Sequence, residues 1–156
     1  MTIKIEETTN TLLLAKLNHD VQEIHSKIEP EIFKPHSLDN MQILFDSALQ
    51  REDVSAFVAY YEEYPAGYLL LQTRNYPETP YMKKHSAICI EHICVESKYK
   101  GKGVGKALVD FAKVFAEENN VDRIELDFWT GNKNAGEFFS SQGFSTYNEK
   151  MCLKLK

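Results

Sequence analysis

A nearly continuous apolar segment, "SAICIEHICV" at 86–95, constrains the fold of this chain most. Only Glu91 and His92 interrupt it, and such a run is typical of a strand that is buried on both faces of a sheet. The segment that follows carries an apolar stripe at helical spacing, formed by Val104, Ala107, Leu108, Phe111, Ala112 and Phe115. "DRIELDFW" at 122–129 then predicts another strand. A strand, a helix and a strand in this order predict a parallel pair with a crossover helix.

The other segments place this unit in a mixed domain. Apolar periodicity and turn residues predict a strand at 3–5, helices over 12–28 and 38–50, a hairpin of 54–61 and 68–76 joined at "EEYPAG", a short helix closed by Gly143, and a last strand in "EKMCLKLK" at 149–156. The expected fold class is therefore α/β, with a mixed, mostly antiparallel sheet around a central parallel βαβ unit. We expect residues 1–156 to form a single domain.

Composition excludes several classes of protein. The chain has 156 residues, of which 43% are hydrophobic and 26% charged, values typical of one soluble globular domain. A formal net charge of -5 argues against nucleic-acid binding and favours small cationic partners. Three cysteines without a CxxC pair or a secretory run predict reduced thiols and a cytoplasmic protein. We expect no membrane span, and the five histidines show no spacing typical of a metal site.

The predicted helix over 104–118 begins with residues that are poor at starting a helix. "KGKGVGK" at 100–106 holds three glycines, each costing about 1 kcal/mol against alanine in a helix interior. Its lysines have the wrong charge for a helix N-terminus, and no capping side chain lies at 100–103. These features make sense together if an anion takes the place of the cap, because glycines let backbone N–H groups approach it closely. The sequence thus predicts a phosphate or pyrophosphate site, with a passive glycine turn as the alternative.

Two common phosphate motifs do not match this loop. A P-loop requires Ser or Thr where Ala107 stands, and the dinucleotide fingerprint requires a third glycine where Lys106 stands. "KGKGVG" instead matches the pattern Gln/Arg-x-x-Gly-x-Gly/Ala, with Lys100 in the first position. "NKNAGEFFSSQGF" at 132–144 is similar to N-x-x-A-x-x-F-Y-x-x-x-G-F. With the order of strand, loop and helix, the chain resembles the GNAT superfamily of N-acetyltransferases, most specifically over 90–144.

The resemblance implies acetyl-CoA as the cofactor. Its pyrophosphate would lie on the backbone of Lys100, Gly101, Lys102, Gly103, Val104, Gly105 and Lys106. Its pantetheine arm would pair like an added strand with Ile93, Cys94 and Val95, and Asn132 and Asn134 would either contact this arm or cap the helix that follows. "HSKIEPEIFKP" at 25–35 resembles the substrate side of the family, so the acceptor pocket is expected to involve His25, Glu29, Phe33 and Tyr81.

Glu91 is the expected catalytic base. It is a carboxylate in an apolar strand, and its position matches the base of the family, often acting through water. The alternatives are that a neighbouring cation satisfies its charge or that it binds the substrate ammonium. His92 is the lesser candidate, and adjacent residues of a strand should face opposite sides. Cys94 is expected to be an inert buried thiol, because no partner base is evident.

One departure from the family affects catalysis. The family usually carries a Tyr that protonates the leaving CoA thiolate, and Phe139 occupies that position here. Water, Ser140 or Tyr147 would have to replace it.

Three functional hypotheses follow from these residues. The first is an N-acetyltransferase that moves an acetyl group from acetyl-CoA to an amine of a small molecule or peptide. The second is a catalytically weak or inactive acyl-CoA-binding regulatory module, and the third, more remote, is an unrelated nucleotide-binding domain. Among partners we expect neither nucleic acid nor membrane, and a homodimer through the last strand is possible.

Overall fold

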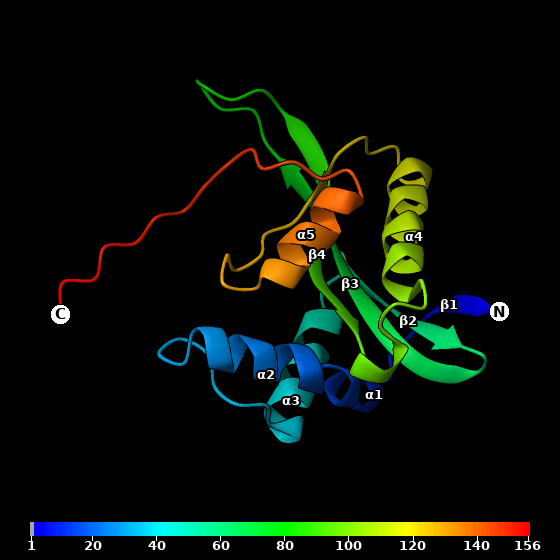
Figure 1. Cartoon of the computed structure of the whole chain (residues 1–156). Coiled ribbons are helices and arrows are strands. Elements are labelled where there is room, and N and C mark those ends of the chain that lie inside the picture. The colour runs from blue at the N-terminus through cyan, green and yellow to red at the C-terminus, as the bar shows by residue number, and fades with distance from the viewer. Residues whose placement is uncertain (1) are drawn as a thin grey trace.

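The computed structural model describes residues 2–156 and shows one sheet with helices on both faces (Figure 1). The elements are β1 (Ile3–Glu7), α1 (Thr11–Leu17), α2 (His19–Ile28), α3 (Leu38–Leu49), β2 (Val54–Tyr61), β3 (Tyr64–Tyr76), β4 (His85–Val95), the 3-10 turn η1 (Ser97–Tyr99), α4 (Val104–Glu118), β5 (Ile124–Glu125) and α5 (Lys133–Ser141). The five strands lie in the order β1-β2-β3-β4-β5. All neighbours are antiparallel except β4 and β5, which are parallel. The predicted mixed α/β sheet is confirmed.

The core has one layer on each face of this sheet. Phe57 of β2 belongs to the cluster under α4, whereas its neighbour Val58 belongs to the cluster under α1 and α3, because successive strand residues point to opposite faces. Three members of the predicted stripe of α4, Val104, Leu108 and Ala112, are buried, and Phe111 and Phe115 are partly buried against the same cluster. Val109 and Ala116 are also buried, although the predicted stripe did not include them. None of the described helices combines the length and apolarity that crossing a bilayer requires.

The predicted single helix over 12–28 is wrong, because Asn18 divides it into α1 and α2. Asn18 is 2% exposed, and its Nδ2 donates a hydrogen bond to the Tyr68 hydroxyl at 3.0 Å. A short polar side chain that is drawn into the core this way positions the chain for a new helix axis. As a result, α2 lies beside β4, where it borders the pocket described below.

Two predicted strands also differ from the structure. The hairpin turns at Glu62 and Glu63, with φ of 47° and 76°, and not at the proline and glycine of "EEYPAG", which lie within β3. The strand expected over 122–129 is regular only at Ile124 and Glu125.

The last strand, expected over 149–156, forms no ladder with any described residue. It runs as an extended tail away from the body (Figure 1). Its alternating sequence suits a strand, but a strand also needs a neighbour to satisfy its backbone groups.

Candidate active site

A pocket of about 470 Å³ lies between β4, α2 and the starts of α4 and α5. It is lined by Asp20, Val21, Ile24, Ile93, Cys94, Val95, Tyr99, Lys100, Gly101, Gly103, Val104, Gly105, Lys106, Asn132, Asn134, Ala135, Phe138 and Phe139. Every residue that the sequence predicted for the cofactor lines this pocket except Lys102. The contributions of α2 and of Tyr99 had no signal in the sequence, because they depend on the tertiary arrangement alone.

The start of α4 opens into this pocket without a cap of its own. Gly103 is the N-cap residue at φ 86°, and no side chain bonds the free N–H groups of the first turn. Gly101 also has positive φ, at 76°. A helix leaves its first four N–H groups without intrahelical partners, so this turn presents donors and a positive dipole end to the pocket. The arrangement fits a phosphate group.

Gly105 serves a different purpose from the one expected. Gly105 is not one of the described glycines that have a positive φ. A Cβ placed on it would stand 3.0 Å from the Phe138 ring. A glycine therefore favours close packing of α5 on α4, because any larger residue would have to displace the Phe138 ring. Backbone freedom is not the reason, although Gly105 still lines the pocket.

The three lysines of the loop are not equivalent. Lys100 and Lys106 line the pocket, and Lys106 Nζ forms an ion pair with Asp110 Oδ2 at 2.6 Å along α4. Lys102 Nζ lies 5.5 Å from the centroid of the Tyr61 ring, away from the lining residues. The side chain of Lys102 thus has a cation–π contact instead of a place in the pocket.

Strand β4 separates from β5 beside this loop. The two strands pair only at Ile88 and Cys89, and the stretch from Ile93 to Val95 pairs with β3 alone. Its second edge therefore offers backbone N–H and C=O groups to the pocket. An amide-bearing chain can pair with such an edge in the manner of an added strand.

An irregularity in β4 coincides with this separation. Ile90 pairs with Leu71 and His92 pairs with Leu70, so Glu91 is an extra residue that has no partner in β3. Ile90 packs under α4, whereas Cys94 packs under α1, so the bulge exchanges the two faces of the strand. Simple alternation along the sequence could not have predicted this exchange.

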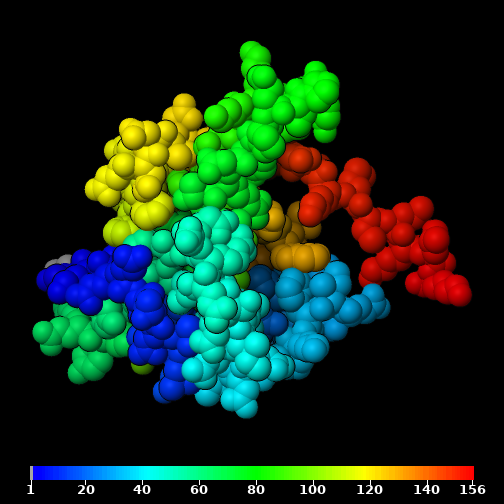
Figure 2. Space-filling model, turned by 180° about the vertical axis from the view of Figure 1, so that it is seen from behind, coloured from blue at the N-terminus to red at the C-terminus, as the bar shows by residue number. Residues whose placement is uncertain are grey.

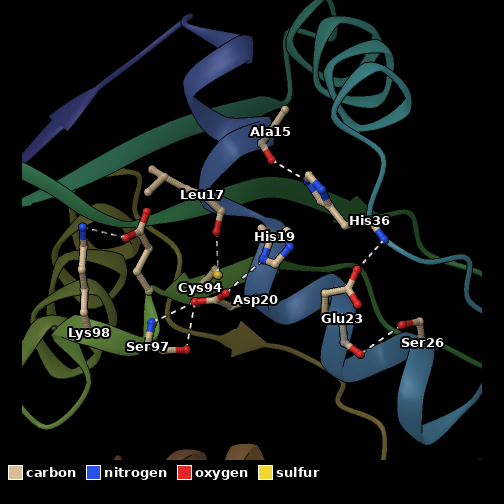
Figure 3. A network of polar contacts seen from close by, with 11 residues as sticks. Ala15, Leu17, His19, Asp20, Glu23, Ser26, His36, Cys94, Ser97 and Lys98 are labelled. Carbon is tan, nitrogen blue, oxygen red and sulfur yellow. Dashed lines mark hydrogen bonds and ion pairs between the residues drawn. The ribbon is translucent and has the colours of Figure 1, made fainter.

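Asp20 ties α2 to the loop after β4 (Figure 3). Its Oδ2 accepts hydrogen bonds from the backbone N and the Oγ of Ser97, both at 2.9 Å. The bond from the Ser97 backbone lowers the pKa of Asp20. This carboxylate therefore holds one wall of the pocket in place, a role that the sequence did not reveal.

Cys94 lies in the same region with its Sγ donating to the Leu17 carbonyl at 3.1 Å (Figure 3). Burial raises the pKa of the Cys94 thiol to about 12. The thiolate that a nucleophile requires is thus absent near neutral pH, as expected for an inert thiol.

The predicted base, Glu91, is partly exposed and does not line the pocket. Its Oε1 forms an ion pair with Arg74 Nη2 at 2.7 Å. The alternative that a neighbouring cation satisfies this carboxylate therefore has structural support, and the catalytic role stays a prediction.

His92 belongs to a buried polar chain. The Tyr68 hydroxyl lies 2.9 Å from His92 Nδ1 and accepts from Asn18 Nδ2. Burial lowers the pKa of His92 to about 4, so its ring is neutral at pH 7. Because it is buried and bonded to Tyr68 through Nδ1, the imidazole acts first as a structural element of β4.

The residues expected to line an acceptor pocket are only partly brought together. The rings of His25 and Phe33 stack at 4.8 Å, and Trp129 meets Phe33 edge-on at 5.0 Å. Tyr81 is 87% exposed and belongs to the loop between β3 and β4. This loop lies at the far tip of the hairpin from α2 (Figures 1 and 2). His25, Phe33 and Trp129 thus form an aromatic wall, in which Trp129 stands in place of Tyr81. The sequence had predicted Trp129 only as part of a strand.

Two residues of the C-terminal motif have clear structural roles. Asn132 Oδ1 accepts from Ala135 N at 3.2 Å and so caps α5, which confirms the capping interpretation of this residue. Phe139 is 7% exposed and packs on Phe128 and Phe144. It borders the pocket but has no proton to donate, and neither Ser140 nor Tyr147 is among the lining residues.

Fold and pocket together define a domain of the acetyltransferase type. The sequence model of the acetyltransferase (GNAT) family matches residues 18–144. The chain belongs to this family, and the resemblance seen in its motifs is confirmed. A curated relative, an uncharacterized N-acetyltransferase of Lactobacillus delbrueckii subsp. lactis, is 32% identical over 64 residues, which span 41% of this chain and 37% of that protein.

Solved structures share the fold over its full length. A mutant of the BH1408 protein from Bacillus halodurans is 25% identical with a TM-score of 0.90, covering 100% of both chains. A predicted acetyltransferase from Clostridium acetobutylicum, solved with acetyl-CoA, is 17% identical with a TM-score of 0.73, covering 99% of this chain and 97% of that one. AAC(6')-Iy, solved with a CoA-linked bisubstrate analog, is 15% identical with a TM-score of 0.70, covering 100% and 99%. The last two likenesses concern the fold alone.

Proposed function

We propose that this protein is an N-acetyltransferase that moves an acetyl group from acetyl-CoA to an amine of a small molecule or peptide. One observation carries the proposal: the uncapped start of α4 and the unpaired edge of β4 open into the same pocket. The first provides donors for a diphosphate and the second provides a strand edge for an amide-bearing arm. Coenzyme A carries both groups.

In this proposal the chain holds the cofactor mainly by its backbone. The N–H groups from Gly101 to Lys106 bind the pyrophosphate, and Lys100 adds charge. The edge from Ile93 to Val95 pairs with the amides of the arm, and the diverging strands leave room for the thioester. Bound acetyl-CoA supplies an acetyl group that is activated for attack by an amine.

The acceptor amine would meet the aromatic wall of His25, Phe33 and Trp129. Burial lowers the pKa of His25, so this wall carries no positive charge at neutral pH. Aromatic faces attract an ammonium group, and Glu91 then takes its proton, directly or through water. Arg74 orients the carboxylate of Glu91 through their ion pair.

The second candidate, an acyl-CoA-binding regulatory module, is favoured by one specific observation. Phe139 stands where the family usually has a proton donor, and the hydroxyls of Ser140 and Tyr147 do not line the pocket. A protein without a donor can still bind the cofactor, so binding alone does not distinguish the two candidates.

Turnover with a panel of amines, followed as free thiol, tests the proposal. We expect acetylation of at least one amine, and a loss of about 100-fold in kcat for Glu91→Gln with CoA affinity unchanged. Glu117→Gln, an exposed change on α4, serves as the matched control. Tight CoA binding without turnover across the panel supports the regulatory module instead. The absence of CoA binding overturns both.

A further inference from the structure

Because of the bulge in β4, Glu91 and His92 lie on the same face of the sheet. Leu70 of β3 packs under α1 and α3, so Arg74, further along the same strand at even spacing, points to the same face. Glu91 Oε1 reaches Arg74 Nη2 at 2.7 Å. His92 Nδ1 lies 2.9 Å from the hydroxyl of Tyr68, which belongs to the same cluster as Leu70. The two candidate bases therefore share one face, contrary to the alternation expected from the sequence.

The helices leave part of this face uncovered. Among the described residues of β3 and β4, the cluster under α1 and α3 extends toward the β3–β4 loop only as far as Leu70 and Cys94. Polar side chains that contact one another continue the face beyond this point. They are called here the open face and consist of Gln72, Arg74, Tyr76, Glu91 and Glu125.

Each carboxylate of the open face has an arginine partner. Glu91 pairs with Arg74, and Glu125 Oε1 pairs with Arg123 Nε, also at 2.7 Å. The open face therefore presents positive and negative groups side by side. An acceptor that carries only positive charge would meet an arginine next to each carboxylate, whereas an acceptor with both charges would be complementary to the face.

Arg74 has hydrogen-bonding capacity left for a ligand. A guanidinium has five N–H donors in a fixed fork. Gln72 Oε1 accepts from Nε at 3.0 Å, Glu91 accepts from Nη2, and the Tyr76 hydroxyl is a third hydrogen-bond partner. The side chain of Arg74 is 44% exposed. Two donors thus remain for an incoming carboxylate, the group that a guanidinium binds best.

The aromatic wall of His25, Phe33 and Trp129 lies between the open face and the cofactor pocket. The pKa of His92 is lowered to about 4, mainly by burial and also by the proximity of His25, so the wall comes close to β4 beside the proposed base. Ile24, which precedes His25 on α2, lines the cofactor pocket. An acceptor on the open face would therefore have an uncharged, aromatic surface beside it and the cofactor beyond that surface.

On the basis that the protein is an N-acetyltransferase, we propose that its acceptor is an α-amino acid with a free carboxylate and an apolar or aromatic side chain. The carboxylate binds Arg74, the ammonium group lies against Glu91, which takes its proton, and the side chain packs on the aromatic wall. An α-amino acid carries its two charges on neighbouring atoms, as the Arg74–Glu91 pair does. Simple amines lack the group that Arg74 would bind.

Three acceptors that differ at one group test this assignment. Phenylalanine, phenylalaninamide and phenethylamine share the amine and the ring, but only phenylalanine has a carboxylate. With acetyl-CoA, kcat/KM for phenylalanine is expected to exceed the other two values by about 30-fold, the worth of hydrogen bonds to a charged group. Calorimetry on the CoA-saturated protein makes the same comparison without turnover, and phenylalanine should bind about 10-fold more tightly than its amide. Equal rates, or equal or undetectable binding of all three, overturn the proposal.

The variant Arg74→Gln tests whether this arginine makes the distinction. It should reduce the ratio of kcat/KM for phenylalanine to that for phenethylamine from about 30 to about 3. A loss that acts through the orientation of Glu91 affects both acceptors and cancels from the ratio. Lys4→Gln is the control, because it breaks an ion pair of the same length, 2.7 Å to Glu6, on β1 at the other edge of the sheet. This control should keep the ratio, and an unchanged ratio in Arg74→Gln overturns the role of Arg74.

Failure of the proposed function would look different. If no amine is acetylated while phenylalanine binds the CoA complex more tightly than its amide, the chain is a binding module and the amino-acid site stands. If phenethylamine is acetylated as fast as phenylalanine, the chain is an N-acetyltransferase and the amino-acid site is excluded.

Discussion

The starts of α4 and α5 border the same pocket but are built in opposite ways. α5 opens with Asn132, whose side chain bonds the backbone N of Ala135 at 3.2 Å. α4 opens with Gly103 at φ 86° and has no side-chain cap. The first turn of α5 therefore has a backbone N–H bonded to a capping side chain, whereas the first turn of α4 has no such hydrogen bond.

This difference separates a helix start that is capped by a side chain from one that is not. An asparagine is a common N-cap residue of helices, so the presence of Asn132 in the pocket lining is not by itself evidence of ligand binding. Gly103 offers no side chain that could cap α4, so we expect this helix start, unlike that of α5, to depend on a ligand for its free N–H groups. The comparison predicts that changes at α4 act on cofactor affinity and changes at α5 act on stability.

The largest expected effect concerns His92 of β4, the strand that lines the pocket together with both helix starts. Burial lowers the pKa of His92 from about 6.5 to about 4, so the unfolded chain binds a proton that the folded chain excludes. Stability is then complete above about pH 6.5 and falls by about 3 kcal/mol as the pH drops to about 4. Urea unfolding of the wild type and of His92→Gln at pH 7 and pH 4 measures this loss. Equal losses in the two proteins would contradict it.

The next largest effect is expected at Gly103. Gly103→Val should weaken CoA binding about 100-fold, or about 2.7 kcal/mol, because a branched side chain disturbs the turn that presents the N–H groups. Gly143→Val is the matched control, because Gly143 also has positive φ, at 96°, but lies outside the pocket lining. Both variants should lose stability in thermal unfolding. Calorimetry should show lost CoA affinity for Gly103→Val alone. Equal CoA affinities of the two variants would contradict a special role of the α4 start in binding.

A smaller effect is expected at the cap of α5. Asn132→Ala should cost about 1 kcal/mol of stability and change CoA affinity less than about 3-fold. Ser37→Ala removes the corresponding cap of α3, where Ser37 Oγ accepts from Asn40 N at 3.2 Å, and should cost a similar amount. If only Asn132→Ala lowers CoA affinity by about 10-fold or more, Asn132 binds the ligand as well, and the two helix starts are less different than they look.

The smallest effect concerns the charge on α4. Lys106 is held by Asp110, and the hydrogen bond from this lysine lowers the pKa of Asp110. Asp110→Asn should release Lys106 toward the pocket and raise CoA affinity about 2-fold, or about 0.4 kcal/mol, with a steeper salt dependence. Calorimetry at low and moderate salt, with Glu117→Gln as the control, measures the change. Unchanged affinity and salt dependence would exclude Lys106 as a contributor to anion binding.

Much of the site was predictable because its signals are local. The stripe of α4, the glycines before it and the closure of α5 at Gly143 each lie within a few residues of sequence. Periodicity and backbone freedom decide such features without help from distant segments. For this reason the predicted cofactor residues, except Lys102, line one pocket.

The features that sequence reasoning missed depend on contacts between distant segments. The break at Asn18 depends on Tyr68, fifty positions away, and the clamp of Asp20 depends on Ser97. The real purpose of Gly105 depends on Phe138. None of these partners can be identified from the neighbours of the residue in the chain.

The order of amino acids thus predicted the mixed sheet, the βαβ unit and the uncapped start of α4, because local backbone preferences and hydrophobic periodicity depend on consecutive residues. Folding in three dimensions settled the rest: the bulge at Glu91 that exchanges the faces of β4, the wall of Trp129 and Phe33, and the unpaired tail. A strand is complete only when a neighbour bonds its backbone, and a side chain gains a role only from what it touches. Both depend on how the whole chain packs.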